Sequence, residues 1–187
     1  MKVGILAFHG DFAEHEEILR KLGHTPVEVR ARTDLKQLRH LIIPGGESTV
    51  LSAFLESSGL AQQIKKNVEK GELSVFGTCA GAIILSKKAR GKNAPKTLRL
   101  INMVILRNAY GTQQDSFEES IRVEGIRKPV AVAFIRAPII VKTGRSVKVL
   151  ATHRKNPVVV QQGNVLAATC HPEIRGDTQL HEYFLRM

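Results

Sequence analysis

Short apolar segments alternate with segments of helical periodicity through the first half of the chain, and this alternation limits the possible folds more than any other feature. Apolar runs of strand length occupy residues 2–8, 26–30, 38–44 and 74–78, and helical patterns occupy residues 11–23, 48–58, 60–70 and 80–89. Strands that alternate with helices form parallel sheets with helices on both faces. The first half therefore predicts an α/β fold with a mostly parallel sheet.

The second half has a different character, because it consists of short β-rich runs separated by turn signals. The runs occupy residues 121–126, 130–137, 139–144, 147–153, 157–162 and 164–170, and a helical pattern closes the chain at 178–187. The Gln-Gln-Gly-Asn sequence at 161–164 predicts a hairpin turn. We expect one domain over residues 1–187, with antiparallel additions to the sheet in the second half.

Charge and composition argue against two classes of partner. Lys and Arg outnumber Asp and Glu by 28 to 17, but the basic residues are scattered, aromatic residues make up 5% and Trp is absent. Nucleic-acid-binding proteins usually concentrate charge in a stripe with aromatic residues for stacking, so we expect no nucleic-acid partner. No apolar run reaches the roughly 18 residues of a membrane span, and the apolar N-terminus is too short for a signal peptide. We therefore expect a cytoplasmic protein without a membrane partner.

A lone cysteine lies between two glycines at the junction of a predicted strand and a predicted helix. The sequence Gly77-Thr78-Cys79-Ala80-Gly81 has the spacing of a nucleophile elbow, a sharp turn that exposes a reactive side chain. Glycines let the turn close without steric overlap, and the start of a helix favours a thiolate. A buried cysteine in a tight turn is the simpler interpretation, but the paired glycines favour Cys79 as a nucleophile.

A thiol nucleophile needs a base, and the chain has seven histidines. His171 is the strongest candidate, because Glu173 lies two residues further on and residues two apart in an extended chain face the same side. Glu173 would then orient the ring of His171, with Pro172 stiffening the spacing. His9 is the second candidate, since it lies at the carboxyl end of the first strand, where sites form in α/β folds.

A third segment, Pro44-Gly45-Gly46-Glu47-Ser48-Thr49, also follows a predicted strand directly. Two glycines before a helix supply backbone N–H groups that can hold an oxyanion. An ordinary N-cap at Ser48 or Thr49 is the simpler interpretation of this segment alone. Together with Cys79 and the His–Glu pair, however, the loop completes a nucleophile, a base and an oxyanion site.

The second cysteine offers a competing assembly, a metal site built from Cys79, Cys170, His171 and Glu173. These residues lack the paired spacing that metal sites usually show, so we expect neither a metal nor a cofactor. Two cysteines are also too few for a disulfide framework, and a reducing compartment would keep both as thiols.

In combination, these segments resemble the class I (triad-type) glutamine amidotransferases, and more narrowly the glutaminase subunit of pyridoxal 5′-phosphate synthase. The resemblance runs from residue 3 to the end of the chain through LIIPGGEST, VFGTCAGAIIL, LRNAYG, DSFE, AFIRAP and HPE. GTCAG and HPE are shared by the wider class, whereas PGGEST, RNAYG and FIRAP in this order are the specific signals.

The resemblance implies that Cys79 attacks the side-chain amide of glutamine, with His171 as base and then acid and Glu173 as its orienting group. The N–H groups of Gly46 and Ala80 would form the oxyanion hole. The implied glutamine pocket contains Gly46, Glu47, Ser48, Arg107, Ile135 and Arg136. The ammonia would pass to a separate synthase (lyase) subunit that makes pyridoxal 5′-phosphate.

Three residues depart from the family pattern. His9 stands where the family usually has glutamine, Thr112 replaces a usual arginine, and Cys170 replaces a common phenylalanine. The departures leave the triad intact and concern mainly the contact with the partner subunit.

Two other functions stay open at this point. The chain would also suit a glutaminase subunit of histidine or purine biosynthesis, or a non-hydrolytic cysteine-elbow protein with a stress or redox role. The His171–Glu173 pair argues against the sensor, because a sensor needs a reactive cysteine but no base.

Overall fold

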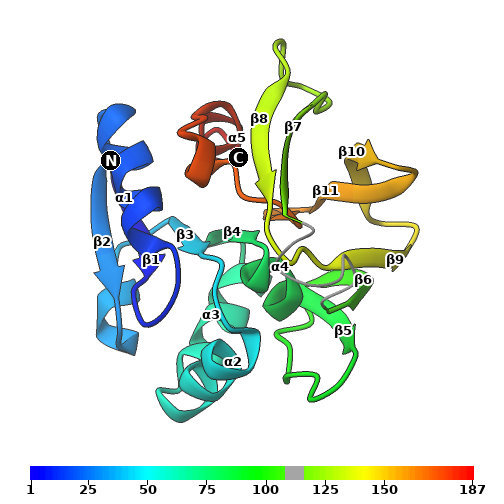
Figure 1. Cartoon of the computed structure of the whole chain (residues 1–187). Helices are drawn as coiled ribbons and strands as arrows, with labels where there is room; N and C mark the ends of the chain where they lie inside the picture. Colours follow the sequence, from blue (N-terminus) through cyan, green and yellow to red (C-terminus); the bar gives the residue numbers. More distant parts are fainter. Residues whose placement is uncertain (108–115) are drawn as a thin grey trace.

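The computed structural model, which describes residues 1–107 and 116–187, has a seven-stranded sheet at its centre (Figure 1). The strand order is β10-β11-β12-β4-β3-β1-β2. The parallel strands are β1 (Lys2–Leu6), β2 (Thr25–Val29), β3 (His40–Ile43), β4 (Ser74–Thr78) and β12 (Val165–Ala168). Antiparallel pairs then add β11 (Asn156–Gln162) and β10 (Lys148–His153). The predicted α/β class, mostly parallel with antiparallel additions, is confirmed.

Helices cover both faces of the sheet, and each face has its own apolar core. One core contains residues of α2 (Ser48–Ser57), α3 (Leu60–Glu69) and α4 (Ala80–Leu85), and the other contains residues of α1 (Phe12–Lys21) and α5 (Gln179–Leu185). The strands supply side chains to both, since Leu41 and Ile43 enter the first core and Ile42 enters the second. This period of two is the geometry of a sheet buried on both faces, and it explains the continuous apolar runs of the sequence.

Two smaller sheets and two short 3₁₀-helices complete the part of the chain that the structure describes. One sheet joins β5 (Ser86–Arg90), β6 (Ile101–Leu106) and β9 (Ile139–Thr143), and the other joins β7 (Phe117–Ile121) and β8 (Val130–Phe134). The 3₁₀-helices are η1 (Arg32–Leu35) and η3 (Glu173–Arg175). Among the helices of the described residues, none is long and apolar enough to cross a membrane.

The helix predicted over residues 80–89 is wrong in its second half. The helix α4 ends at Leu85, and the chain continues as strand β5 from Ser86. The hydroxyl of Ser86 donates a 2.8 Å hydrogen bond to the carbonyl of Ile83 and so satisfies one free acceptor at the helix end. Pairing of β5 with β6 then determines the conformation of the following residues.

The parallel strands bring the candidate site together. The carboxyl ends of β1, β3, β4 and β12 meet at one edge of the sheet, and the segments that follow them contain His9, Gly46, Cys79 and His171. Loops at this edge are where ligands bind in open α/β sheets.

The close packing of α4 against β3 and β4 leads to a stability prediction. A Cβ at Gly81 would overlap the carbonyl oxygen of Ile43, whereas Gly163, at the β11–β12 turn, has no atom within 4 Å of such a Cβ. We expect Gly81→Ala to lower the free energy of unfolding by about 3 kcal/mol, because the clash is with backbone. Urea unfolding measures the effect.

The matched control is Gly163→Asn, since Gly163 has a φ of 56° that asparagine tolerates. We expect this variant to lose less than about 1 kcal/mol. An equal loss in both variants would contradict the packing argument.

Candidate active site

The Cys79 turn is the geometric centre of the site. Cys79 has φ 47° and ψ −100°, a conformation that non-glycine residues rarely adopt, and it lies between the last residue of β4 and the first of α4. Its backbone N–H donates a 2.8 Å hydrogen bond to the carbonyl of Ala168 in β12. The residue is 9% exposed, and its Sγ atom lies 4.0 Å from the carbonyl oxygen of Ile135. The predicted strand-to-helix elbow is therefore present, with the strain expected at a functional turn.

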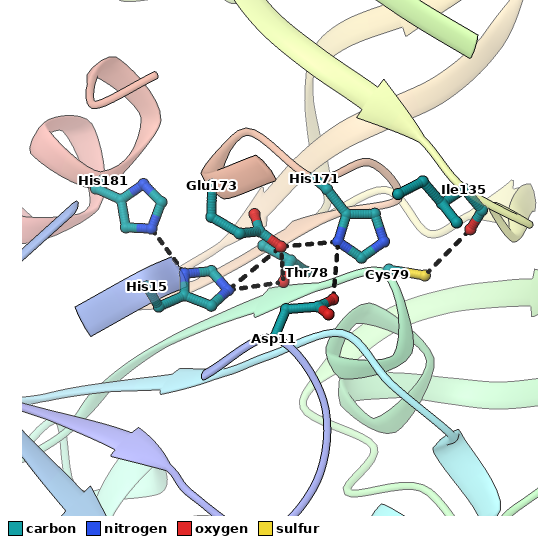
Figure 2. Close-up of polar contacts among 8 residues, drawn as sticks. All are labelled: Asp11, His15, Thr78, Cys79, Ile135, His171, Glu173 and His181. Carbon is teal, nitrogen blue, oxygen red and sulfur yellow. Dashed lines mark hydrogen bonds and ion pairs between the residues drawn. The ribbon is translucent and has the colours of Figure 1, made fainter. Parts of the chain in front are cut away.

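His171 and Glu173 form a buried pair beside this turn (Figure 2). The Nδ1 atom of His171 lies 2.7 Å from Oε1 of Glu173. The predicted contact exists, but its cause differs from the extended spacing we expected. His171 is bridged to Ala133 through its backbone, whereas Pro172 has φ −67° and ψ −32° and leads into η3. A helical turn rather than an extended strand thus brings the carboxylate to the ring.

Charge interactions within the pair favour a protonated imidazole. Burial alone would lower the pKa of His171, but Cys79 and Glu173 together raise this pKa well above its ordinary value. Burial raises the pKa of Glu173, and the hydrogen bond with His171 opposes that effect. An imidazolium next to a thiol stabilises the reactive thiolate.

Asp11 is a site residue that the sequence analysis did not identify. Its place at the start of the helical pattern over residues 11–23 predicts an N-cap with Glu14 as capping-box partner, yet its side chain makes no capping hydrogen bond. Instead, Oδ2 of Asp11 lies 3.3 Å from Nδ1 of His171, so two carboxylates face the same ring nitrogen. The position of Asp11 just after β1, next to His9, is the signal that could have pointed to this role.

The glycine loop after β3 lies against His171 and His9. A Cβ at Gly45 would overlap the ring of His171, and one at Gly46 would lie 3.1 Å from Cδ2 of His9. Gly46 also has φ 134°, which only glycine adopts easily. The loop can therefore approach the site only because both residues lack side chains.

Two of the expected pocket residues, Glu47 and Arg107, contact each other at the start of α2. Oε1 of Glu47 accepts hydrogen bonds from Nη2 of Arg107 at 2.9 Å and from the N–H of Thr49 at 3.2 Å. Glu47, not Ser48 or Thr49, is thus the N-cap of α2. Burial would raise the pKa of Glu47, but the Thr49 hydrogen bonds, Arg107 and Arg136 lower it overall. Ser48 is buried at the start of the helix.

The residues that depart from the family pattern lie in different surroundings. His9 is exposed next to Gly46, and Cys170 is fully buried, where burial raises the pKa of its thiol. Thr112 lies outside the described residues.

The ligand-type atoms of Asp11, His171 and Glu173 lie within 4.8 Å of one another. Within the described part of the chain this group includes neither cysteine, so the competing metal assembly of the sequence analysis is not formed. The His171–Glu173 hydrogen bond and the nearby Asp11 carboxylate account for the short distances.

Comparisons with known proteins show which family the chain is similar to. The model of the SNO glutamine amidotransferase family matches residues 5–187. A pyridoxal 5′-phosphate synthase subunit PdxT of Thermus thermophilus is 45% identical over 185 residues, covering 99% of this chain and 96% of the relative. The protein of the same name from Thermosipho africanus is 46% identical over 188 residues, covering 100% and 98%.

Solved structures extend the similarity to three dimensions. A crystal structure of a glutamine amidotransferase superposes with a TM-score of 0.94 at 45% identity, covering 98% of this chain and 97% of that one. The structure of PurLQS from Thermotoga maritima superposes with a TM-score of 0.71 at 17% identity, covering 99% and 97%, and this likeness concerns the fold alone.

The different surroundings of the two thiols lead to a labelling prediction. We expect iodoacetamide at pH 7 to modify Cys79 at least about tenfold faster than Cys170, because thiolate character and access control the rate. Cys170 is fully buried and burial raises its pKa. Mass spectrometry of tryptic peptides measures both rates, and urea-unfolded protein, in which both should react, is the control. Equal rates in the folded protein would contradict the assignment.

Proposed function

The chain belongs to the SNO glutamine amidotransferase family, and from this membership and the geometry of its site we propose that it hydrolyses L-glutamine to glutamate and ammonia for the synthesis of pyridoxal 5′-phosphate. The observation that carries the proposal is the strained Cys79 turn next to a buried His171–Glu173 pair with a 2.7 Å contact. That combination supplies a nucleophile, a base and an orienting carboxylate. We propose residues 1–187 as one glutaminase domain that needs no cofactor or metal.

The proposed reaction proceeds in two halves. The Cys79 thiolate forms a C–S bond to the side-chain carbonyl carbon of glutamine, and the N–H groups of Gly46 and Ala80 stabilise the resulting oxyanion. His171 gives its proton to the amide nitrogen, and the C–N bond breaks. Ammonia departs, and the glutamyl group remains bound to Cys79 as a thioester. Water then attacks the thioester while His171 takes a proton from that water. The C–S bond breaks, glutamate is released, and Cys79 is free again.

Charges around the loop support recognition of an amino acid. The carboxylate of Glu47 complements an α-ammonium group, and the guanidinium groups of Arg107 and Arg136 complement an α-carboxylate. The N-terminus of α2 at Ser48 and the carbonyl of Ile135 next to the thiol complete the proposed pocket.

Several properties of the proposed partner follow from the chemistry. Ammonia loses its nucleophilicity when water protonates it, so delivery requires a bound pyridoxal 5′-phosphate synthase (lyase) subunit. The relatives named PdxT, at 42–46% identity over nearly the whole chain, support this acceptor over histidine or purine biosynthesis.

We propose a cytoplasmic location and no contact with nucleic acid or membrane. A non-hydrolytic sensor gains no support, since it has no use for the His171–Glu173 pair.

Variants of the triad test the proposal directly. With the synthase present, we expect Cys79→Ser and His171→Ala to lower kcat by several orders of magnitude, as in other triads. Glu173→Gln should lose less, because it keeps the shape of the side chain. His9→Gln should keep most activity, since His9 is exposed beside Gly46 and glutamine is the usual residue of the family at this position. Glutamate release measures all four, and an active His171→Ala enzyme would overturn the assignment.

A second prediction concerns control by the synthase. We expect kcat/KM for glutamine to rise at least about tenfold when the synthase binds, because the Gly46 peptide can change orientation at little steric cost. Gly46→Val should bind the synthase and lose the rise. Steady-state assays measure kcat/KM, with binding checked by sedimentation. An unchanged kcat/KM with bound synthase would exclude this mode of control.

A further inference from the structure

Three buried polar side chains lie directly behind Glu173 and have no part in the proposed reaction (Figure 2). The hydroxyl of Thr78 lies 3.3 Å from Oε1 of Glu173. Nε2 of His15 lies 3.1 Å from that hydroxyl and 3.5 Å from the same carboxylate oxygen. Nδ1 of His15 in turn lies 2.8 Å from Nε2 of His181. All three side chains are fully buried.

The ionised carboxylate determines which atom donates at each contact. A carboxylate can only accept hydrogen bonds, so the single proton of the Thr78 hydroxyl must point to Glu173. The hydroxyl oxygen then accepts from Nε2–H of His15, because the opposite orientation would leave lone pairs facing the carboxylate. Nδ1 of His15 therefore carries no proton and accepts from Nε2–H of His181.

This arrangement requires both histidines to be neutral, and their burial supports it. Burial lowers the pKa of His181 to about 3 and, together with His181 and His171, lowers the pKa of His15 well below its ordinary value. Each ring therefore holds one proton near neutral pH, and each proton is used once. The remaining ring nitrogen, Nδ1 of His181, is an acceptor without a partner among the described residues, which is where such a chain would end.

We propose that His181, His15 and Thr78 form a chain of hydrogen bonds in which each group donates to the next and Thr78 donates to Glu173. This chain keeps Glu173 ionised and directed at His171. The inference rests on the proposed function, since it assigns Thr78 and His15 as positioning residues of the same triad. They act on glutamine hydrolysis only through Glu173.

The surroundings of Glu173 explain why such a chain is needed. Burial raises its pKa, and the nearby carboxylate of Asp11 adds to the increase. His171 opposes both effects through its hydrogen bond and charge. The thiol of Cys170, another titratable neighbour of Glu173, stays neutral because burial raises its pKa. Hydrogen bonds to a charged group are among the strongest in proteins, so the Thr78 donor, which His15 Nε2–H holds in this orientation, favours the carboxylate form.

The ring protons can be observed without any enzyme assay. In ¹⁵N-labelled protein at pH 7, the imidazole ¹⁵N shifts should show the Nε2–H tautomer for both His15 and His181. The shifts should stay constant between pH 6 and pH 8. A proton on Nδ1 of His15, or a positive charge on either ring in that range, would overturn the inference.

A pair of threonine variants tests the effect on activity. Thr78→Val removes the donor with little change of shape, whereas Thr78→Ser keeps it. Thr169→Val is the matched control, because Thr169 is equally buried and its hydroxyl has no partner in the described part of the chain. The measurement is the pH profile of kcat/KM in the complex with the synthase.

We expect the acid limb of Thr78→Val to move up by about one pH unit, since Glu173 holds its proton to higher pH without the donor. The alkaline limb should stay in place, because Glu173 is ionised at alkaline pH in both proteins and still supports the His171 imidazolium. Thr78→Ser and Thr169→Val should keep the wild-type profile. If Thr78→Val lowers kcat/KM at every pH and leaves the pH range of activity as wide as in the wild type, the inference is rejected.

Two features keep the test decisive. If Thr78→Val does not fold, His181→Phe serves in its place, because it frees His15 to change tautomer and should shift the acid limb in the same direction. A wild-type complex that releases no glutamate would refute the proposed function, whereas the tautomer measurement tests the chain of hydrogen bonds independently of turnover.

Discussion

The close packing of α4 against β3 and β4 is the constraint on which the site depends. A Cβ at Gly77 would lie 2.6 Å from the backbone of Gly81, and one at Gly81 would overlap the backbone of β3. Because both positions lack side chains, α4 can begin immediately after β4, and the chain must turn within a single residue. That residue is Cys79, whose positive φ is stabilised by its neighbours rather than by its own preference. The position of the Cys79 thiol at this sheet edge is therefore a consequence of backbone packing on both sides of it.

Features encoded by neighbouring residues were predictable from the sequence. The Gly77–Gly81 elbow, the His171–Glu173 contact and the Gly45–Gly46 loop each lie within five residues or fewer, so local spacing identified them. The helix predicted over 80–89 failed in its second half, because the pairing of β5 with β6 is a tertiary contact that local periodicity does not record. The N-cap of α2 was misplaced for a similar reason, since its acceptor is also bound by the distant Arg107.

The residues that were missed are those joined by long-range contacts. Asp11 was interpreted as a helix cap. Its carboxylate instead lies 3.3 Å from the ring of His171, which is 160 positions further along the sequence. His15 and His181 lie on helices at positions that a periodicity argument assigns to the core, and both are indeed fully buried. Only the fold reveals that their polar atoms meet each other and Thr78. Buried polar groups seldom lack partners, which is why three such groups in contact indicate a shared role.

The inner and outer sides of the site differ in a way that separates catalysis from its control. On the inner side, Glu173 is fixed by groups that are fully buried and whose ring protons are each committed to one contact. On the outer side, the Gly46 loop lies next to the exposed His9 and has a backbone conformation that glycine can leave at small cost. Under the proposed function, a partner that docks on the outer side can therefore reorient the Gly46 N–H without disturbing His171 and Glu173. Since the pair remains intact in the free chain, the thiol should stay reactive toward small electrophiles even where glutamine turnover is slow. Reactivity of the nucleophile and stabilisation of the oxyanion are thus separate properties of this fold. The buried groups around Glu173 determine the first, and the Gly46 loop on the outer side determines the second.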